Sequence, residues 1–309
     1  MDSVAVPPQF AQRTVRGTAR CEGIGVHTGR WVSMTIRAGR PDTGIQFVRS
    51  DLPPGLGIIP ARIELLAGVD RRLVLANVHG HTVQSVEHLL AALVACGVDN
   101  ATVELDGPEV PTLDGSAREF VQMILRAGRA HQRRVRRFVV IERMIAVRRG
   151  DRRAALLPSD VPRATLSIEY AERGIDFQCI STALDEETLQ RDIGDARCFG
   201  FLDEAGELRE RGLALGASLL NTVVLDEGRA ANPEGLRSPD ELIRHKVLDC
   251  VGGLALAGAP IIGHVAAHKP GHALMTDLVK ALQTHPAAWS FVRAGAAPLG
   301  GRNRLRPPG

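Results

Sequence analysis

Apolar and polar positions along the chain follow two different spacings, one typical of strands and one typical of helices. Residues 31–37 (WVSMTIR) and 101–105 (ATVEL) alternate apolar and polar side chains, as expected for strands with one buried face. Apolar residues between positions 86 and 94 recur instead every three or four residues, which predicts a helix. Ser85 as its N-cap and Gly97 just after its end strengthen that prediction.

The same patterns define the remaining elements. A second helix is predicted from Ala117 to about Arg126, after the turn at residues 114–116. Further on, we expect strands near residues 138–148, 154–158 and 164–169, and helices near residues 185–192, 239–256 and 273–283. Because strands and helices mix without a regular strand–helix–strand rhythm, the sequence favours an α+β layered fold over a doubly wound sheet.

The length of 309 residues is typical of two domains. Arginines crowd the stretch before the strand at residue 138, at Arg126, Arg129, Arg133, Arg134, Arg136 and Arg137. We interpret this stretch as a solvated interdomain linker, with contact to phosphate or anionic lipid as the alternative. The predicted units are an N-terminal α+β domain at 1–130, a C-terminal α+β domain at 131–300 and a basic tail at 301–309.

Composition narrows the class of protein. Apolar residues make up 44% of the chain and charged residues 24%, which excludes a disordered tail or a coiled-coil rod. The net charge of +3 indicates no broad basic surface for nucleic acid, although it is compatible with an anionic small molecule. Five cysteines without a CxxC pair argue against a disulfide framework and a cysteine zinc module, so we expect a reducing cytoplasm.

No pattern along the chain indicates secretion or membrane insertion. The N-terminal residues lack a basic segment followed by an apolar one, so we expect no secretory signal. The uncharged run between Asp249 and Lys269 is interrupted by glycine, proline and histidine. We therefore expect a buried helix followed by a strand there, no transmembrane segment, and a monomer.

The segment from Ser238 to Asp249 carries the most informative helix. Ser238 and Glu241 are predicted to form a capping box, with Pro239 at the first helical position. His245 and Asp249 are four positions apart, so both side chains share one face of the helix. An exposed pair without function is the simplest explanation of this spacing taken alone.

Glu87 and His88 give the pair a second meaning, because they stand in the first turn of the other strong helix in otherwise apolar sequence. Two histidines and one aspartate would leave an open coordination position, as in catalytic zinc sites. Glu87, next to a ligand, would then accept a proton from the attacking water. The same donor set also serves non-haem iron oxygenases, so iron chemistry stays open.

Seven short motifs occur in an order that resembles one family. They are GIGVHTG at 23–29, SVEHLLAA at 85–92, VDN at 98–100, PTLDGSA at 111–117, FGF at 199–201, RHKVLD at 244–249 and KPGHAL at 269–274. Together they resemble the UDP-3-O-acyl-N-acetylglucosamine deacetylases, the zinc amidases of lipid A synthesis, over roughly residues 12 to 292. The resemblance implies a duplicated α+β sandwich of two domains with the active site at their interface.

The resemblance also implies residue roles. Those assigned to catalysis are the zinc ligands His88, His245 and Asp249, the general base Glu87, the active-site lysine Lys246, and His272, which protonates the leaving amine. Those assigned to substrate are Lys269 at the diphosphate, Phe199, and an acyl-chain passage in residues 199–224 lined by Leu202, Ala205, Ala214, Leu219 and Thr222. We interpret His27 as a structural or peripheral residue and Asp114 as a turn former.

Three departures from the family pattern affect the expected chemistry. Cys198 stands where the family usually has a threonine that donates to the oxyanion, and a thiol is a weaker donor. Gly253 stands where an aspartate usually pairs with the catalytic histidine, and residues 71–81 lack the expected threonine-containing pattern. Cys198 is either a weak catalytic donor or a thiolate that occupies the open metal position.

These observations predict a zinc-dependent hydrolase that removes the N-acetyl group of UDP-3-O-(3-hydroxyacyl)-N-acetylglucosamine and releases acetate. Fe²⁺ in place of Zn²⁺ stays open. The alternatives are a diverged paralogue that binds an acylated sugar nucleotide with weak or no activity, and a metal amidohydrolase with a different amide substrate.

Overall fold

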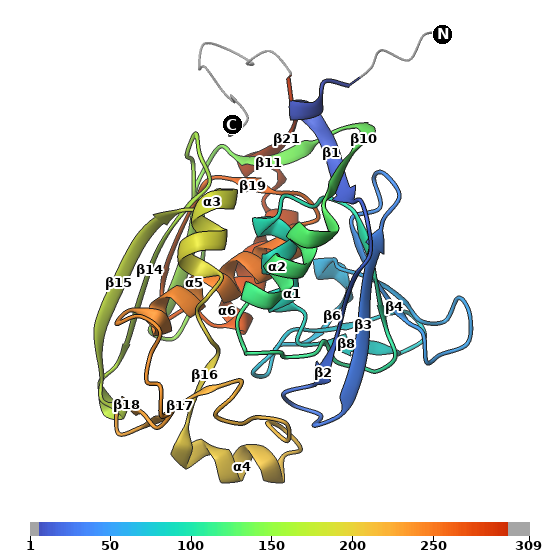
Figure 1. The fold of residues 1–309 in the computed structure, drawn as a ribbon. Coiled ribbons are helices and arrows are strands. Elements are labelled where there is room, and N and C mark those ends of the chain that lie inside the picture. The colour runs from blue at the N-terminus through green and yellow to red at the C-terminus, as the bar shows by residue number, and fades with distance from the viewer. Residues whose placement is uncertain (1–5, 296–309) are drawn as a thin grey trace, which may run out of the picture.

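A computed structural model describes residues 6–295, so the basic tail expected at 301–309 lies outside the described residues. Its central layers are helices packed between two sheets (Figure 1). The helices are α1 (Glu87–Ala95), α2 (Arg118–Ala127), α5 (Glu241–Leu254) and α6 (His272–Thr284). The short helix α3 (Glu186–Thr188) lies beside α1 in the helical layer, and α4 (Ala205–Glu210) lies outside it at the lower end of the molecule.

The two large sheets repeat one topology. The first has the order β2 (Ala19–Ile24), β3 (Trp31–Ala38), β9 (Ala101–Leu105), β4 (Ile45–Arg49), β5 (Ile58–Pro60). The second has the order β12 (Ile145–Arg149), β13 (Arg152–Leu157), β20 (His264–His268), β14 (Arg163–Tyr170), β15 (Ile175–Ala183). In each sheet the central strand comes last in the sequence. β9 is antiparallel to β3 and parallel to β4, and β20 is likewise antiparallel to β13 and parallel to β14. The predicted α+β layered sandwich is therefore confirmed, and the repeat in strand order shows its duplication.

Smaller sheets complete the structure. One pairs β1 (Ala11–Val15) with β10 (Arg129–Val135), and another joins β19 (Ile261–Ile262), β11 (Arg137–Ile141) and β21 (Trp289–Arg293). The remaining two are β6 (Leu66–Gly68), β7 (Val74–Ala76), β8 (Thr82–Gln84) and β16 (Phe199–Phe201), β17 (Val223–Asp226), β18 (Arg229–Ala230). The last of these lies next to α4 at the lower end of the molecule (Figure 1).

Segments that alternate apolar and polar residues form strands with one buried face, as the sequence predicts. Along β3, Val32, Met34 and Ile36 are buried while their neighbours face outward. The uncharged run after Asp249 forms the end of α5 and then β19 and β20, as expected. Within residues 6–295, no helix is both long and apolar enough to cross a membrane.

The arginine-rich stretch is not a solvated linker, because residues 129–135 pair with the N-terminal strand as β10. Arg129 forms an ion pair with Glu186, and Arg136 pairs with Asp99. The sequence interpretation was wrong because the partner strand lies more than a hundred residues away and leaves no local signal.

Two predicted helix caps are also wrong. Ser85 does not cap α1, since its hydroxyl donates to Glu109 and the helix begins at Glu87 after Val86. Glu241 forms no capping box with Ser238, and α5 begins at Glu241 itself. In each case a distant charged residue competes with the local capping bond and wins.

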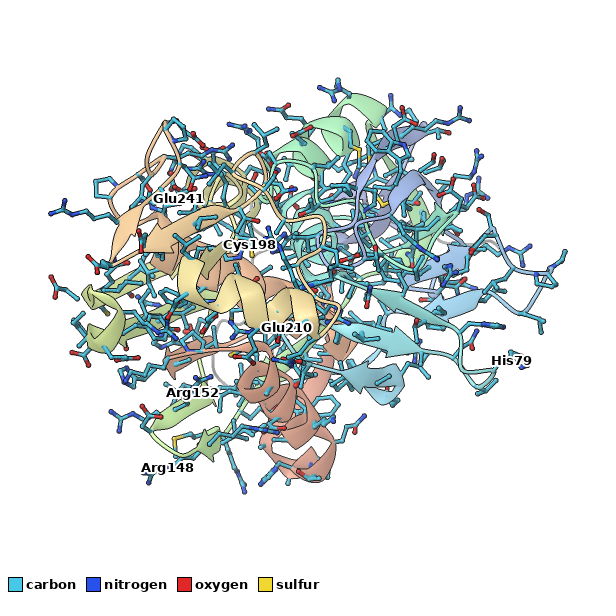
Figure 2. The ribbon with its side chains drawn as sticks, turned by 90° about the horizontal axis from the view of Figure 1, so that it is seen from below. His79, Arg148, Arg152, Cys198, Glu210 and Glu241 are labelled. Carbon is cyan, nitrogen blue, oxygen red and sulfur yellow. The ribbon has the colours of Figure 1, made fainter. Side chains whose placement is uncertain are left out.

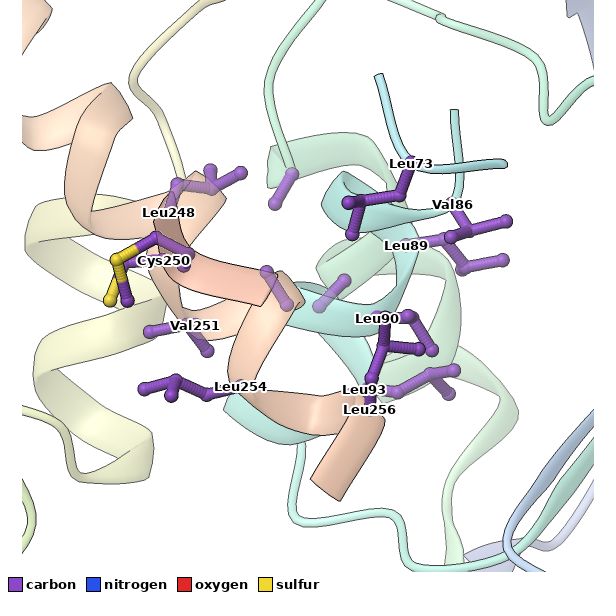
Figure 3. Packing of buried hydrophobic residues seen from close by; sticks show 14 of the residues in the cluster. Leu73, Val86, Leu89, Leu90, Leu93, Leu248, Cys250, Val251, Leu254 and Leu256 are labelled. Atoms are coloured by element: carbon purple, nitrogen blue, oxygen red, sulfur yellow. The ribbon is translucent and has the colours of Figure 1, made fainter. Parts of the chain in front are cut away.

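The crossing of α1 and α5 positions the site described next. Leu89, Leu90 and Leu93 of α1 and Leu248, Val251 and Leu254 of α5 belong to one apolar cluster, and the two sets lie on opposite sides of the paired helices (Figure 3). Gly252 makes the crossing close, because a Cβ at this position would lie 2.1 Å from the Glu87 carbonyl oxygen. Any side chain at 252 would therefore push the start of α1 away from α5.

Candidate active site

Three donor groups converge where α1 meets α5. The Nε2 atoms of His88 and His245 each lie 3.4 Å from Oδ1 of Asp249. The two imidazole rings meet edge to face, with centroids 4.9 Å apart. Across residues 6–295, Oδ1 finds no hydrogen-bond partner although it is buried. The structure thus brings together the three residues expected to bind the metal.

The spacing of these atoms fits a metal ion. Around a tetrahedral zinc with ligand distances of about 2.0–2.2 Å, neighbouring donor atoms lie about 3.3–3.6 Å apart. Two of the three separations, from Oδ1 of Asp249 to each imidazole Nε2, are 3.4 Å and fall in that interval. A buried carboxylate oxygen without a hydrogen bond is costly unless something positive binds it, so a cation explains the arrangement.

The protonation states of His245 and Asp249 also suit a metal, whereas at His88 burial lowers the pKa but Asp249 outweighs it and raises the pKa above its ordinary value. The Nδ1 atom of His245 lies 3.1 Å from the carbonyl oxygen of Ala196, which makes Nδ1 the donor and leaves the Nε2 lone pair free. Burial lowers the pKa of His245 below its ordinary value, although Asp249 opposes this shift. Burial raises the pKa of Asp249, but His245 and Lys246 outweigh it and hold the pKa well below its ordinary range. Neutral imidazole and ionised carboxylate are the forms that bind metals.

Glu87 and His272 face each other beside the three donors. Oε2 of Glu87 accepts a hydrogen bond of 3.2 Å from the backbone N–H of Leu73, which fixes the orientation of the carboxylate. Oε1 of Glu87 lies 3.7 Å from Nε2 of His272, the first residue of α6. Glu87 is 5% exposed, so the pair is largely screened from bulk water.

Lys246 lies on the other side of Asp249. Its Nζ donates to Oδ2 of Asp249 at 3.3 Å and lies 4.7 Å from the centroid of the Phe199 ring. Burial lowers the pKa of Lys246, but the ion pair with Asp249 outweighs burial and raises the pKa above its ordinary value. The amine is therefore a stable positive charge, and Phe199 limits where it can move.

Cys198 contributes a fourth donor atom. One donor atom each from Cys198, His88 and His245 lie within 4.8 Å of one another. Burial raises the pKa of the thiol to about 12. Figure 2, viewed from below, shows Cys198 near the middle of the molecule and Glu241 toward its edge.

Sequence reasoning missed the ion pair that holds this segment. Arg197 is buried and makes hydrogen bonds of 2.9 and 3.1 Å to the two carboxylate oxygens of Glu241. Glu241 stands one turn before His245 on α5. The only sign of this ion pair in the sequence is the charge of Glu241 on an apolar helix face, and from the sequence we interpreted Glu241 as a capping residue.

Glu109 is a second buried carboxylate that the sequence did not single out. It accepts hydrogen bonds from the backbone N–H groups of His27 and Thr28 and from the hydroxyl groups of Thr28 and Ser85. Nδ1 of His27 in turn accepts from the N–H of Ala214 at 3.3 Å. His27 therefore connects the N-terminal turn to the segment around residue 214, in keeping with a peripheral position.

The residues expected to contact substrate lie farther out. Lys269 pairs with Asp151 at 3.1 Å on the surface. Leu202 and Leu219 are 48% and 41% exposed, and the carboxylate of Asp114 binds Ser116, Arg118 and Arg237. Asp114 is thus a turn residue within an ion-pair network, as predicted.

A family model described as UDP-3-O-acyl N-acetylglycosamine deacetylase matches residues 12–284. A protein of Phenylobacterium zucineum is 44% identical over 278 residues, covering 90% of this chain and 95% of the relative. A protein of Myxococcus xanthus is 40% identical over 295 residues, covering 96% and 93%. A protein of a Geobacter species is 40% identical over 282 residues, covering 91% and 92%. All three relatives carry the name UDP-3-O-acyl-N-acetylglucosamine deacetylase.

Proposed function

The chain belongs to the UDP-3-O-acyl N-acetylglycosamine deacetylase family, and from this membership we infer that it hydrolyses the acetamide of an acylated UDP-N-acetylglucosamine. The products are acetate and the free amine of the sugar, in lipid A biosynthesis. The observation that carries this function into the structure is the buried Asp249 oxygen facing two imidazole nitrogens at 3.4 Å.

We propose that His88, His245 and Asp249 hold the metal, and that the metal is Zn²⁺. Three protein ligands with a free position are the pattern of catalytic zinc sites, and the donor separations support it. When bound there, the ion supplies Lewis-acid polarisation of the amide carbonyl. Fe²⁺ accepts the same donors, so metal analysis of the purified protein decides between the two.

Glu87 is proposed as the general base. Its carboxylate is fixed by Leu73 N–H, so it accepts the proton of the attacking water as the water oxygen bonds to the acetamide carbon. His272 donates a proton to the sugar nitrogen when the carbon–nitrogen bond breaks. The 3.7 Å between Glu87 and His272 supports the pair as the route for proton transfer from water to amine.

Lys246, Cys198 and Phe199 are proposed to act around the carbonyl. The charge of Lys246, kept in place over Phe199, favours the negative charge that develops on the carbonyl oxygen. Cys198 offers a weak S–H donor to the same oxygen. Lys269 is proposed to meet the diphosphate, which would replace the exposed carboxylate of Asp151 as the partner of its amine.

We propose that residues 199–224 hold the acyl chain. Exposed leucines at 202, 215 and 219 give this segment more apolar surface than solvation alone favours. Leu213, beside Ala214, lines a hollow of about 280 Å³ together with Gly68, Val69, Asp70, Arg72, Val74 and Arg211. Arg72, which lines the hollow, directly precedes Leu73, and the N–H of Leu73 donates to Glu87.

We also propose a domain boundary, a cytoplasmic location and a monomeric enzyme. The repeated sheet order supports a domain boundary near residue 130, with Glu87 and His88 in the first domain and His245, Asp249 and His272 in the second. All five cysteines, each within the described residues, are free thiols, which supports a cytoplasmic location. The substrate is a small molecule, and we propose that the enzyme acts as a monomer.

Acetate release from the acylated sugar nucleotide by the purified protein tests the function. We expect turnover that a chelator abolishes and that added Zn²⁺ restores. Binding of the sugar nucleotide without acetate release, at full zinc occupancy, would identify a binding paralogue instead.

A further inference from the structure

Cys198 lies just before β16, outside both α1 and α5, and brings a donor atom close to His88 and His245. We propose that its sulfur is a fourth ligand of the metal in the substrate-free enzyme, giving a closed centre of two histidines, one aspartate and one cysteine that substrate opens by displacing the sulfur. The proposal rests on the metal site of the proposed function and goes beyond it, because it assigns a resting state that must be opened before catalysis.

The geometry leaves the sulfur a short distance to travel. Zinc–sulfur bonds of about 2.3 Å and zinc–nitrogen bonds of about 2.0 Å place sulfur about 3.5 Å from nitrogen in a tetrahedral site. The donor atoms of Cys198, His88 and His245 all lie within 4.8 Å of one another. The sulfur therefore lies within about 1.3 Å of the separation that a tetrahedral site requires.

The backbone around Cys198 is held from both sides. Its N–H donates to the carbonyl of Gly115, and its carbonyl accepts from the N–H of Val223, both at 2.8 Å. These bonds join the start of β16 to the turn before α2 and to the neighbouring strand β17. Cys198 therefore has a fixed position relative to the two helices that carry the other donors.

The residue before Cys198 ties this segment to the metal-binding helix. Arg197 is buried and donates to Glu241 through its backbone N–H and its guanidinium, at 3.0, 2.9 and 3.1 Å. One residue earlier, the carbonyl of Ala196 orients the ring of His245. Residues 196–198 thus set both the direction of one ligand and the position of the sulfur.

The chemistry of the donor set agrees with this assignment. Thiolate is a preferred ligand of Zn²⁺ and suits Fe²⁺, and mixed Cys and His sites are common for zinc. Sulfur binds as thiolate, so the S–H proton is released to solvent when the metal–sulfur bond forms. On substrate entry Cys198 would leave the site, and its sulfur would take up a proton from solvent.

A cobalt-substituted full-length enzyme tests the assignment by absorption. Thiolate bound to Co²⁺ gives an intense sulfur-to-cobalt charge-transfer band in the near ultraviolet, which histidine and carboxylate ligands do not give. We expect the band in the wild-type protein and its loss in Cys198→Ala and Cys198→Thr, with one Co²⁺ still bound. Cys179→Ala is the matched control, because Cys179 is exposed on β15 and should leave the band unchanged.

Displacement is tested with the same band in the Glu87→Gln background, where turnover is slow. Adding the acylated sugar nucleotide should remove the charge-transfer band while Co²⁺ stays bound. A band that persists with substrate bound would overturn the displacement. One bound Co²⁺ without any band in the Cys198-containing protein would overturn the fourth ligand and leave the proposed function intact. Failure to bind Co²⁺ at all would instead overturn the metal site of the proposed function.

Discussion

Two buried carboxylates stand about two turns apart on α5, and their surroundings differ. Glu241 is fully buried and accepts hydrogen bonds from Arg197 and from the N–H of Arg237. Asp249 is 8% exposed and accepts one weak hydrogen bond from Lys246 on Oδ2. Within the described part of the chain, its Oδ1 accepts none.

The difference separates a structural carboxylate from a functional one. Burying a charge is costly unless it is paired and hydrogen-bonded, and Glu241 meets both conditions. Asp249 meets them only at Oδ2, through Lys246, and its Oδ1 faces the Nε2 atoms of two imidazoles. A buried carboxylate oxygen without a hydrogen bond therefore indicates a metal ligand more strongly than burial or charge alone.

The largest effect expected from this comparison is the loss of metal from His245→Ala, with the same result for His88→Ala and Asp249→Ala. A site with three protein ligands cannot spare one, so tight binding should disappear and turnover with it. Metal content after gel filtration and acetate release are the measurements. His79→Ala, in an exposed turn, is the control and should keep its metal. Stoichiometric zinc in His245→Ala would remove the proposed site.

Glu87→Gln should keep its metal and lose at least about a hundredfold in turnover, the scale expected when a general base is removed. The amide can still accept from Leu73 N–H, so the local structure is retained. Steady-state acetate release together with metal analysis gives both values. Unchanged turnover would assign the base to another residue.

Glu241→Ala should lower the free energy of unfolding by about 1–3 kcal/mol, because the buried Arg197 loses its hydrogen bonds to Glu241 and keeps only Glu234 and the carbonyl of Gly235 as partners. The folded fraction should still bind one metal per chain, unlike the Asp249 variant. Denaturant unfolding followed by metal analysis distinguishes the two carboxylates. Equal loss of metal in both variants would contradict the division between them.

The same ion pair has a pH dependence with a definite sign. Burial raises the pKa of Glu241, but Arg197 outweighs it and lowers the pKa below the ordinary value of about 4.5. A carboxyl whose pKa is lower in the folded state stabilises the fold above its unfolded pKa and loses that contribution as pH falls through the folded value. The stability difference between wild type and Glu241→Ala should therefore shrink as the pH falls below about 4.5.

The smallest expected effect concerns Gly253, one turn beyond Asp249 on the same helix face. A Cβ there would meet Met275 at an ordinary contact distance of 3.7 Å, so a side chain fits. Gly253→Asp adds a carboxylate near the start of α6 that stabilises a protonated His272. The basic limb of the pH–rate profile should move to higher pH, with a several-fold gain in turnover near neutrality. An identical profile would mean that Glu87, 3.7 Å from His272, already fills this role.

Local sequence patterns predicted where helices and strands lie, but not which distant residues contact them. The helices at 87–95 and 241–254 and the strands at 31–38 and 101–105 were all identified, because each buries one face and its spacing records that. The capping box at Glu241 failed because Arg197, more than forty positions earlier, takes the carboxylate. No local signal predicts such a partner.

The candidate site divides in the same way. The motifs located the donor residues, and the structure brings His88, His245 and Asp249 together, while the roles assigned to them stay predictions. The N–H of Leu73 that orients Glu87 was missed, since a backbone contact carries no side-chain signature. The order of strands in the two sheets was also out of reach, because β9 and β20 insert between strands that precede them in sequence.

The close crossing at Gly252 has a consequence for how the molecule assembles. One proposed ligand, His88, is on α1 and two, His245 and Asp249, are on α5, so neither half would hold the metal alone. A metal that needs all three residues would bind the docked state and not the unfolded chain, and so would stabilise the docked state by mass action. We therefore expect the ion to bind after the two halves have docked. It should slow unfolding and leave the folding rate of each half unchanged.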